Sequence, residues 1–350
     1  MGMDYSAAAA KLRAMRGRCL SNADFERLVQ IGSVREICAY LKATDAYGEI
    51  FADMDENTAH RGEIEMRLNS GFFDEYERLY SFMDRDRREV LRYWFTRREI
   101  NLLTAGLQHV FTHENLQKES MRVGLNPFFD RHSGINIDAL VTSKTIGDLA
   151  AACENTPYYD ILKRAEEAQS DFFSIAMMLD GRYYESLWRA KDKFLDKDER
   201  EVFAELVGSI IDMLNIMWIY RGKKYFGFDP KLIYTYMLPV RYRLTQEQLT
   251  EMVNAPEPEK LVQAVTQTKY ARLFEKCGEG YFVEEIYHSE IYDISRRIFR
   301  NYPKTMAAVF AYLHLKEYEI NAVTMIIEGV RYQHEPVAIR KHINISGREA

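Results

Sequence analysis

The sequence predicts an all-α protein made of three similar helical subdomains. One phrase recurs at 21–47, 133–159 and 245–270, and the copies align without gaps at a spacing of 112 residues. The chain has no sustained run of alternating β-branched residues, the pattern expected of strands. Because a period of this size gives subdomains of ordinary length, we place the three repeats at 1–112, 113–232 and 233–350.

The recurring phrase keeps five positions in register, four apolar residues and a threonine, and a tyrosine follows the threonine within three residues. Copy by copy they are Phe25, Ile137 and Leu249; Leu28, Leu140 and Met252; Ile37, Leu149 and Leu261; Leu41, Cys153 and Val265; Thr44, Thr156 and Thr268; Tyr47, Tyr158 and Tyr270.

Each copy of the phrase predicts a pair of short helices. Ser21 with Asp24, and Thr245 with Gln248, have the spacing of a capping box, which satisfies free backbone amides at a helix start. The third and fourth apolar positions stand four residues apart and therefore share one face of a second helix. The threonine marks the end of that helix, and we expect the apolar positions to be buried.

A longer helical stretch, rich in charged and aromatic residues, follows each pair, at 72–108, 183–226 and 285–332. The first and third stretches carry the phrase Glu-Ile-Asn, beginning at Glu99 and Glu319. The middle stretch has Asp212 and Asn215 at the corresponding place, so the equivalence of these polar positions is left open.

Composition limits the classes of function. The formal net charge of −6 argues against nonspecific nucleic-acid binding as a main role, although a local basic patch is compatible with it. Cys19, Cys38, Cys153 and Cys277 are widely separated, and we expect small buried side chains in a reducing compartment. No signal peptide is recognised. The most apolar stretch, 206–220, is too short to span a bilayer and is interrupted by Asp212 and Asn215.

Catalytic, cofactor and metal motifs give little support to an enzyme. The glycine and lysines at 222–228 lack the spacing of a phosphate-binding loop, and His109 with His113 has no obvious third ligand. We therefore expect no catalytic residues, no metal and no cofactor. Mixed charges at 84–88 and 191–201 are interpreted as solvated helix faces. For Asp212, a hydrogen-bonded acid that holds helix ends or neighbouring repeats together is favoured over a catalytic acid.

The order of these features resembles the C subunit of prokaryotic V-type (A/V-type) ATPases, whose eukaryotic counterpart is the d subunit. The resemblance rests on KLRAMRGRCLSNADFERLV at 11–29, the helix ending in Thr44 and Tyr47, and KEYEINAVTMIIEGVRYQHEPVAIRKHI at 316–343. It covers essentially the whole chain. It implies a funnel-like, non-enzymatic part of a rotor that connects the central shaft to the membrane ring and transmits torque for proton or sodium transport.

The resemblance further implies that the partners are the shaft subunits and the ring proteolipid. It also implies that one copy per complex lies peripherally on the cytoplasmic face of the membrane, with no membrane-spanning segment of its own. Candidates for partner contact are the basic ends of long helices: Arg97, Arg98, Arg221, Lys223, Lys224, Arg296, Arg297 and Arg300. Two alternatives stay open, a helical scaffold with no rotor role and a helical hydrolase that uses Asp212.

Overall fold

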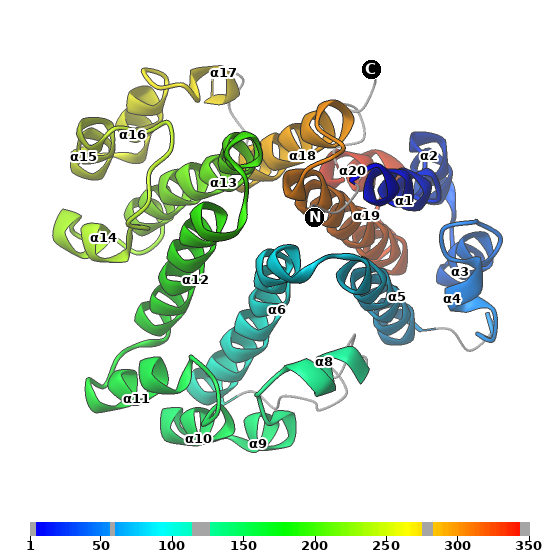
Figure 1. Cartoon of the computed structure of the whole chain (residues 1–350), viewed down its shortest axis with the longest axis horizontal. Coiled ribbons are helices and arrows are strands. Elements are labelled where there is room, and N and C mark those ends of the chain that lie inside the picture. Colours follow the sequence, from blue (N-terminus) through cyan, green and yellow to red (C-terminus); the bar gives the residue numbers. More distant parts are fainter. Residues whose placement is uncertain (1–4, 57–59, 114–126, 275–282, 344–350) are drawn as a thin grey trace. The chain divides into compact units, whose positions relative to one another are not determined.

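The computed structural model describes residues 5–56, 60–113, 127–274 and 283–343, and every regular element in these ranges is a helix (Figure 1). The predicted all-α class is therefore confirmed. The described chain divides into two compact units, each treated separately below. The terminal unit draws on Met1–Met83, Leu116–Ser133 and Tyr312–Ala350, and the central unit on Asp84–Asn115 and Gly134–Ala311. The repeat boundaries at 112 and 232 stay a prediction.

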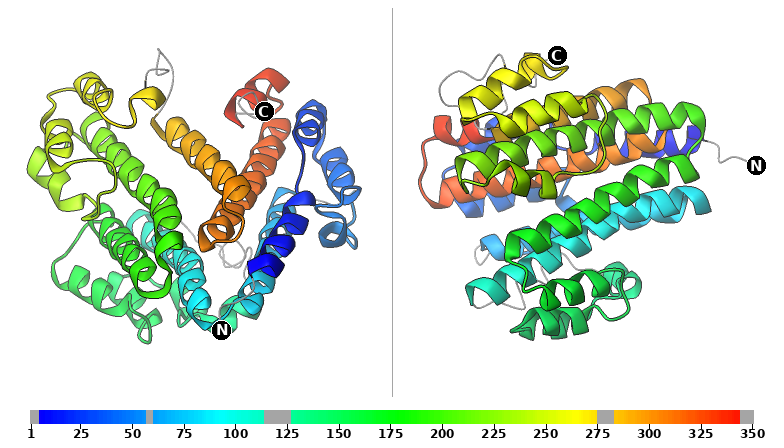
Figure 2. Two further views of the ribbon diagram at one scale, coloured as in Figure 1. Left: turned by 45° about the horizontal axis from the view of Figure 1, so that its top comes forward. Right: turned by 90° about the vertical axis from the view of Figure 1, so that its left-hand side faces the viewer.

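Long helices form the frame of the central unit. They are α6 (Arg85–Thr112), α12 (Phe172–Phe194), α13 (Lys197–Lys224) and α18 (Val283–Asn301). Figures 1 and 2 show α12 running along α6, and α13 running along α18. After its first turn, helix α13 is buried over most of its surface, because its own side chains are mostly apolar on every face.

The terminal unit combines the two ends of the chain. It holds α1 (Tyr5–Gly17), α5 (Arg61–Phe82), α8 (Pro127–His132), α20 (Pro336–His342) and all but the start of α19 (Met306–Arg331). Helices α5 and α19 run antiparallel, since Arg61 pairs with Glu328 while Glu75 lies 3.6 Å from Lys316.

Three modules of short helices lie beside the long helices, and each begins at a helix-capping residue and ends at the tyrosine of the recurring phrase. Module 1 (21–47) contains α2 (Asn22–Gln30) and α3 (Val34–Lys42), with α4 (Gly48–Phe51) after it. Module 2 (136–158) contains α9 (Ile137–Thr142) and α10 (Ile146–Ala152), with α11 (Tyr159–Glu167) after it. Module 3 (245–270) contains α15 (Gln246–Asn254) and α16 (Pro258–Val265), and lies between α14 (Pro230–Tyr236) and α17 (Ala271–Phe274).

The predicted local features of the modules are present. Ser21 with Asp24, and Thr245 with Gln248, form complete capping boxes, and Thr145 with Asp148 forms one that the sequence analysis missed. Of the twelve aligned apolar positions, Ile137 alone is half-buried, and the others are buried. The modules therefore dock through the predicted apolar faces.

Helix α13 corrects one argument from the sequence. Among the described helices it alone is long and apolar enough to cross a membrane by length and composition, because its 28 residues extend beyond the apolar stretch 206–220. Within the protein, however, 78% of its most apolar window is buried. Its apolar surface therefore faces other parts of this chain.

Candidate functional site

A buried carboxylate on a long helix accepts a hydrogen bond from the tyrosine hydroxyl that ends each module. These three tyrosine–carboxylate junctions lie entirely within one unit or the other. They are Tyr47 to Glu319 at 2.6 Å in the terminal unit, and Tyr158 to Glu99 at 2.8 Å and Tyr270 to Asp212 at 2.9 Å in the central unit. The six residues are at most 8% exposed, so every junction is shielded from water.

The recurring threonine shapes the chain just before each tyrosine. Its hydroxyl donates to the backbone carbonyl three residues earlier, at 2.7 Å from Thr44, 2.8 Å from Thr156 and 2.7 Å from Thr268. This bond uses one of the carbonyls left free at a helix end. The second helix of each module ends two to four residues before this threonine, at Lys42, Ala152 and Val265. The tyrosine that reaches the carboxylate follows the threonine by two or three residues.

The same carboxylate also holds the start of the module in two of the junctions. The backbone amide of Leu20 donates to Glu319 at 2.9 Å, and that of Leu244 donates to Asp212 at 3.1 Å. Each leucine directly precedes the capping residue of its module. One buried acid thus fixes both ends of a module on the long helix.

The contacts of Asp212 confirm the interpretation that this residue is a hydrogen-bonded structural acid. Besides Leu244 and Tyr270, the backbone amides of Tyr242 and Arg243 donate to it, at 3.1 and 2.6 Å. Both carboxylate oxygens are occupied. Asp212 therefore occupies the same role as Glu99 and Glu319, which settles the equivalence that the sequence left open for the acids.

The asparagines of the aligned phrases do not share one role. Asn101 and Asn321 are exposed, whereas Asn215 is fully buried. Asn215 accepts from the backbone amide of Leu238 at 2.8 Å and donates to its carbonyl at 3.4 Å. It fastens the segment that leads from α14 into module 3.

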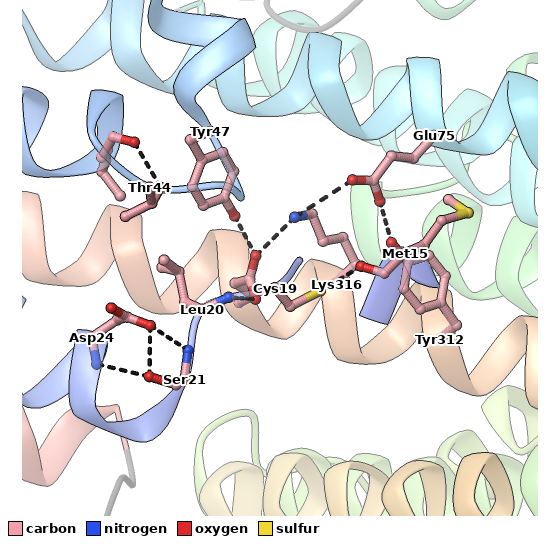
Figure 3. A network of polar contacts seen from close by, with 12 residues as sticks. Met15, Cys19, Leu20, Ser21, Asp24, Thr44, Tyr47, Glu75, Tyr312 and Lys316 are labelled. Atoms are coloured by element: carbon pink, nitrogen blue, oxygen red, sulfur yellow. Dashed lines mark hydrogen bonds and ion pairs between the residues drawn. The ribbon is translucent and has the colours of Figure 1, made fainter. Parts of the chain in front are cut away.

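The junction of module 1 contains further charged groups (Figure 3). Lys316, 3% exposed, lies 2.8 Å from Glu319 and 3.6 Å from Glu75, and its ammonium stands 4.5 Å from the centre of the Tyr47 ring. The hydroxyl of Tyr312 donates to Glu75. Lys316 therefore links the carboxylate under module 1 with a carboxylate on α5.

Electrostatics keep the tyrosines protonated as hydrogen-bond donors. Burial, followed by the charge of the partner carboxylate, raises the pKa of Tyr47, Tyr158 and Tyr270 above the usual value of 10. Burial lowers the pKa of Lys316, but Glu319 and Glu75 outweigh it and raise that pKa above its usual value. The site consequently holds fixed charges and hydrogen bonds, an arrangement suited to rigid docking.

A further buried carboxylate joins the starts of long helices in the central unit. Glu199, 7% exposed, accepts from the backbone amide of Met306 at 2.9 Å and lies 3.4 Å from the guanidinium of Arg87. The ring of Phe310 stands edge-on to Trp94 and Phe203, with ring centres 5.7 and 5.0 Å apart. We call these residues of α6, α13 and α19 the helix hub.

The helix hub corrects the interpretation of 191–201 as a solvated face. Glu199 and Lys191 within that range are buried, at 7% and 8% exposure. These two residues stand among exposed charged residues of both signs at helical spacing, and this sequence pattern is typical of a solvent-facing helix surface. The burial comes from neighbouring helices that the local pattern does not reveal.

The structure places the predicted contact residues of α6 partly inside the fold. Arg97 forms an ion pair with Asp180 and lies over the rings of Tyr183 and Tyr184, 5.6 and 5.8 Å from their centres. Arg98 is half-buried. Their role in partner contact stays a prediction, and Arg97 would have to exchange an existing partner for a new one.

At the end of α13 the predicted basic residues are only partly free. Lys223 donates to the carbonyl of Ala255 at 2.6 Å, and Lys224 donates to the hydroxyl of Tyr220 at 2.6 Å. Arg221 lies 3.7 Å from Glu284. Arg221 and Lys224 are exposed, whereas Lys223 is half-buried.

The predicted basic residues of α18 also differ in whether they already contact other side chains. Arg297 lies 2.9 Å from Glu205, and the guanidinium of Arg296 stands 5.8 Å from the centre of the Tyr292 ring. Arg300 is exposed and forms no ion pair with any described residue. All eight predicted residues lie in the central unit, but they do not form one cluster, because Arg221 pairs with Glu284 at the start of α18 whereas Arg297 pairs with Glu205 near the start of α13.

Cysteines and histidines show no metal centre in the part of the chain that is described. Cys38 and Cys153 are buried as expected, Cys19 is half-buried, and Cys277 lies outside the described residues. His113 ends α6 in the left-handed conformation, with its amide bonded to the carbonyl of His109 at 2.9 Å. No group of three His, Cys, Asp or Glu side chains that could hold a metal ion is found among the described residues.

Comparison with known proteins gives one consistent family. The model of the ATP synthase (C/AC39) subunit family matches residues 8–342. The C subunit of the A-type ATP synthase of Methanocaldococcus jannaschii is 22% identical, with 96% of this chain and 85% of the relative covered. The proteins of the same name from Thermococcus kodakarensis (22% identical; 97% and 90% covered) and Methanosphaera stadtmanae (23%; 93% and 84%) are similar over comparable lengths.

Proposed function

This chain belongs to the ATP synthase (C/AC39) subunit family, and we propose that it is a non-catalytic connector in the central rotor of a rotary ATPase. In this role it joins the central shaft to the membrane rotor ring and transmits torque that couples ATP turnover to proton or sodium transport. Its partners are the shaft subunits and the ring proteolipid, and its place is peripheral, on the cytoplasmic face of the membrane.

The observation that supports this role best is the way each module is fastened. A single buried carboxylate on a long helix accepts the hydroxyl of the module's last residue, and for modules 1 and 3 also an amide at the module's start. Fully satisfied buried polar networks make a fold rigid and define one arrangement. A part that transmits torque needs this property, because a flexible body would store the applied work as deformation.

The chemistry of the buried acids favours a non-catalytic part. Asp212 accepts four hydrogen bonds over its two oxygens, and Glu319 accepts from Tyr47, Leu20 and Lys316. A general acid or base must reach a substrate proton. These carboxylates are committed to the fold and are shielded from solvent, which argues against the hydrolase alternative.

For partner contact, we propose that the exposed cations contribute more than the engaged ones. Arg300 has no ion-pair partner among the described residues, and Arg221 is held by one pair at 3.7 Å, so neither loses a strong contact on docking. Exposed charges mainly steer and orient association. We therefore expect Arg221 and Arg300 to affect assembly more than Arg97 does.

Co-purification tests the role directly. The tagged protein is recovered from detergent-solubilised membranes of its own organism, and the recovered chains are identified by mass spectrometry. Recovery of the ring proteolipid together with shaft subunits supports the connector. Recovery with catalytic subunits but without ring or shaft places the chain elsewhere in the complex, and recovery from the soluble fraction without any ATPase subunit favours the scaffold alternative.

Matched variants in the same experiment test the contact residues. Arg221→Glu and Arg300→Glu, combined, should reduce the recovered partner about threefold or more, whereas Arg182→Glu and Arg189→Glu, combined at two exposed positions of α12 with the same change in net charge, should not. Equal loss in both would mean that net charge rather than these positions controls recovery. Unchanged recovery in both would remove Arg221 and Arg300 from the contact surface.

A further inference from the structure

The three long helices that carry the junction acids end alike. Helix α6 is followed by His113, α13 by a turn that contains Gly227, and α19 by a turn that contains Gln333. Each of these residues has a left-handed backbone, with φ of 56°, 61° and 56°. Each comes fourteen or fifteen residues after the junction acid of its helix. We call these ends helix tips 1, 2 and 3; tips 1 and 2 belong to the central unit and tip 3 to the terminal unit.

Every helix tip presents an exposed aromatic ring just before its left-handed residue. Phe111 is 39% exposed in tip 1, Tyr225 is 52% exposed in tip 2, and Tyr332 is 60% exposed in tip 3. These three residues stand twelve or thirteen positions after the junction acid, so the exposed ring recurs in every repeat. Single exposed apolar residues are ordinary on a protein surface. Recurrence at one position of three diverged copies indicates a shared use.

Hydrogen bonds and ring contacts hold the tips in place. In tip 2 the amide of Phe228 donates to the carbonyl of Gly222 at 2.9 Å, and Phe226 stacks on the Phe228 ring with ring centres 5.2 Å apart. In tip 3 the amide of His334 donates to the carbonyl of Gly329 at 2.8 Å. A ring on a preformed helix end loses little conformational freedom when a partner binds. The tips are therefore preorganised for contact.

Cations lie beside the rings of tips 2 and 3. The ammonium of Lys224 stands 5.5 Å from the centre of the Tyr225 ring, and the guanidinium of Arg331 stands 5.5 Å from that of Tyr332. Both cationic residues are exposed. Aromatic residues and arginine are enriched where protein interfaces are anchored. Because basic groups accompany the rings, the complementary partner segment is acidic.

The opposite ends of the helix pairs lack this regularity. Helices α5, α12 and α18 also finish at or beside an aromatic residue, but Phe194 is half-buried, whereas Phe82 and Tyr302 are 40% and 43% exposed. These ends lie away from the tips, because α5 and α19 run antiparallel, and because Arg221 near tip 2 pairs with Glu284 at the start of α18. An exposed ring in all three repeats is thus found only at the tips among these described helix ends.

We propose that the helix tips contact the membrane rotor ring, each tip meeting an acidic cytoplasmic loop of a different copy of the same ring proteolipid. This inference rests on the rotor role proposed above. A feature that recurs once per repeat suits a partner made of identical copies, because every copy offers the same complementary surface. A partner present once would have to match each tip with a different surface.

Photocrosslinking in the assembled complex tests the contact. The photoreactive residue p-benzoylphenylalanine replaces Phe111, Tyr225 or Tyr332, one at a time, and crosslinked chains from irradiated membranes of the protein's own organism are identified by mass spectrometry. Crosslinks to the ring proteolipid from two or three tips are expected. Phe82 and Tyr302, exposed to a similar degree as Phe111 but at the opposite helix ends, are the controls and should give none. Proteolipid crosslinks from one tip or none would overturn the proposal.

Matched variants test whether the rings contribute to binding. Tyr225→Ser combined with Tyr332→Ser should lower the recovery of ring proteolipid about fivefold or more, the effect of losing an interface anchor. Phe82→Ser combined with Tyr302→Ser should leave recovery unchanged. Urea unfolding should give both double variants the stability of the wild type, because all four rings are exposed. Unchanged recovery with the tip variant, or equal losses with both, would contradict the proposal.

These outcomes separate failure of the inference from failure of the rotor role. If the ring co-purifies with the wild-type protein but the tips give no crosslink, the connector stands and another surface meets the ring. If the ring does not co-purify with the wild-type protein, the rotor role fails and this inference fails with it.

Discussion

The hydroxyl of Tyr270 donates a hydrogen bond to Asp212 at 2.9 Å, and the same carboxylate oxygen also accepts the amides of Arg243 and Leu244. A group at the end of module 3 and groups before its start are thereby fixed by one atom of α13. Because Asp212 is fully buried, loss of any of these bonds leaves a donor without water to replace the acceptor.

Replacement of Asp212 should be strongly destabilising. In Asp212→Asn, an amide nitrogen replaces one of the two carboxylate oxygens and cannot accept the hydrogen bonds that this oxygen now accepts, so the free energy of unfolding should fall by about 2–4 kcal/mol. Urea unfolding followed by circular dichroism measures the change. Asp198→Asn, at an exposed position of the same helix, is the control and should change stability by less than about 0.5 kcal/mol.

Removal of the tyrosine hydroxyls should be costly at each junction. Tyr47→Phe, Tyr158→Phe and Tyr270→Phe each leave a buried carboxylate with one donor fewer, and each should lower the free energy of unfolding by about 1–3 kcal/mol. Tyr332→Phe, at a tyrosine that is 60% exposed, should have almost no effect. A junction variant that behaves like Tyr332→Phe would show that its hydrogen bond does not contribute to stability.

Alkaline pH should weaken the protein through the same tyrosines. Their pKa is raised in the folded protein, so above pH 10 the unfolded chain loses protons that the folded chain keeps, and stability falls as pH rises. The stabilisation of wild type over Tyr270→Phe should therefore decrease by up to about 1.4 kcal/mol per pH unit above pH 10. Unfolding curves of both proteins between pH 9 and 11 test this, and a difference that stays constant with pH would contradict it.

The helix hub should show a measurable coupling between charges. Glu199→Gln and Arg87→Met, alone and combined, form a double-mutant cycle, and we expect a coupling energy of about 1 kcal/mol or more because Glu199 is buried. The exposed pair Lys163–Glu166, at 2.9 Å, is the matched control and should give less than about 0.5 kcal/mol. Equal couplings in the two cycles would mean that burial does not strengthen the hub contact.

The thiols of Cys19 and Cys153 should react slowly and with a steep pH dependence. Burial raises the pKa of Cys19 to about 11 and that of Cys153 to about 12, so both remain protonated at neutral pH, where the reactive thiolate is scarce. Alkylation of Cys19 in the native protein at pH 8 should be at least roughly 100-fold slower than that of a free thiol. Peptide mass spectrometry after timed labelling measures both sites, and fast labelling of Cys19 would show a thiol of ordinary pKa.

Local structure followed from the sequence wherever the cause was local. The capping boxes at Ser21 and Thr245 depend on residues three apart, and the apolar faces depend on residues four apart, so both were predictable and are present. The eight basic residues were predicted from their charge and an expected position at the ends of long helices, but Arg97 and Arg98 lie within α6. Whether such a residue is free depends on neighbours from other helices, and Arg97 was found paired with Asp180, 83 residues away.

By itself, the sequence determined an all-α chain, the helix pairs of the recurring phrase, and the positions of the three tyrosines and of Glu99, Asp212 and Glu319. Only the tertiary structure decided that each tyrosine meets one of these acids. The bond between Tyr47 and Glu319 spans 272 residues, and the burial of Glu199 depends on the starts of other helices. Residues that far apart have no fixed distance along a flexible chain, so their pairing depends on how all the intervening helices pack.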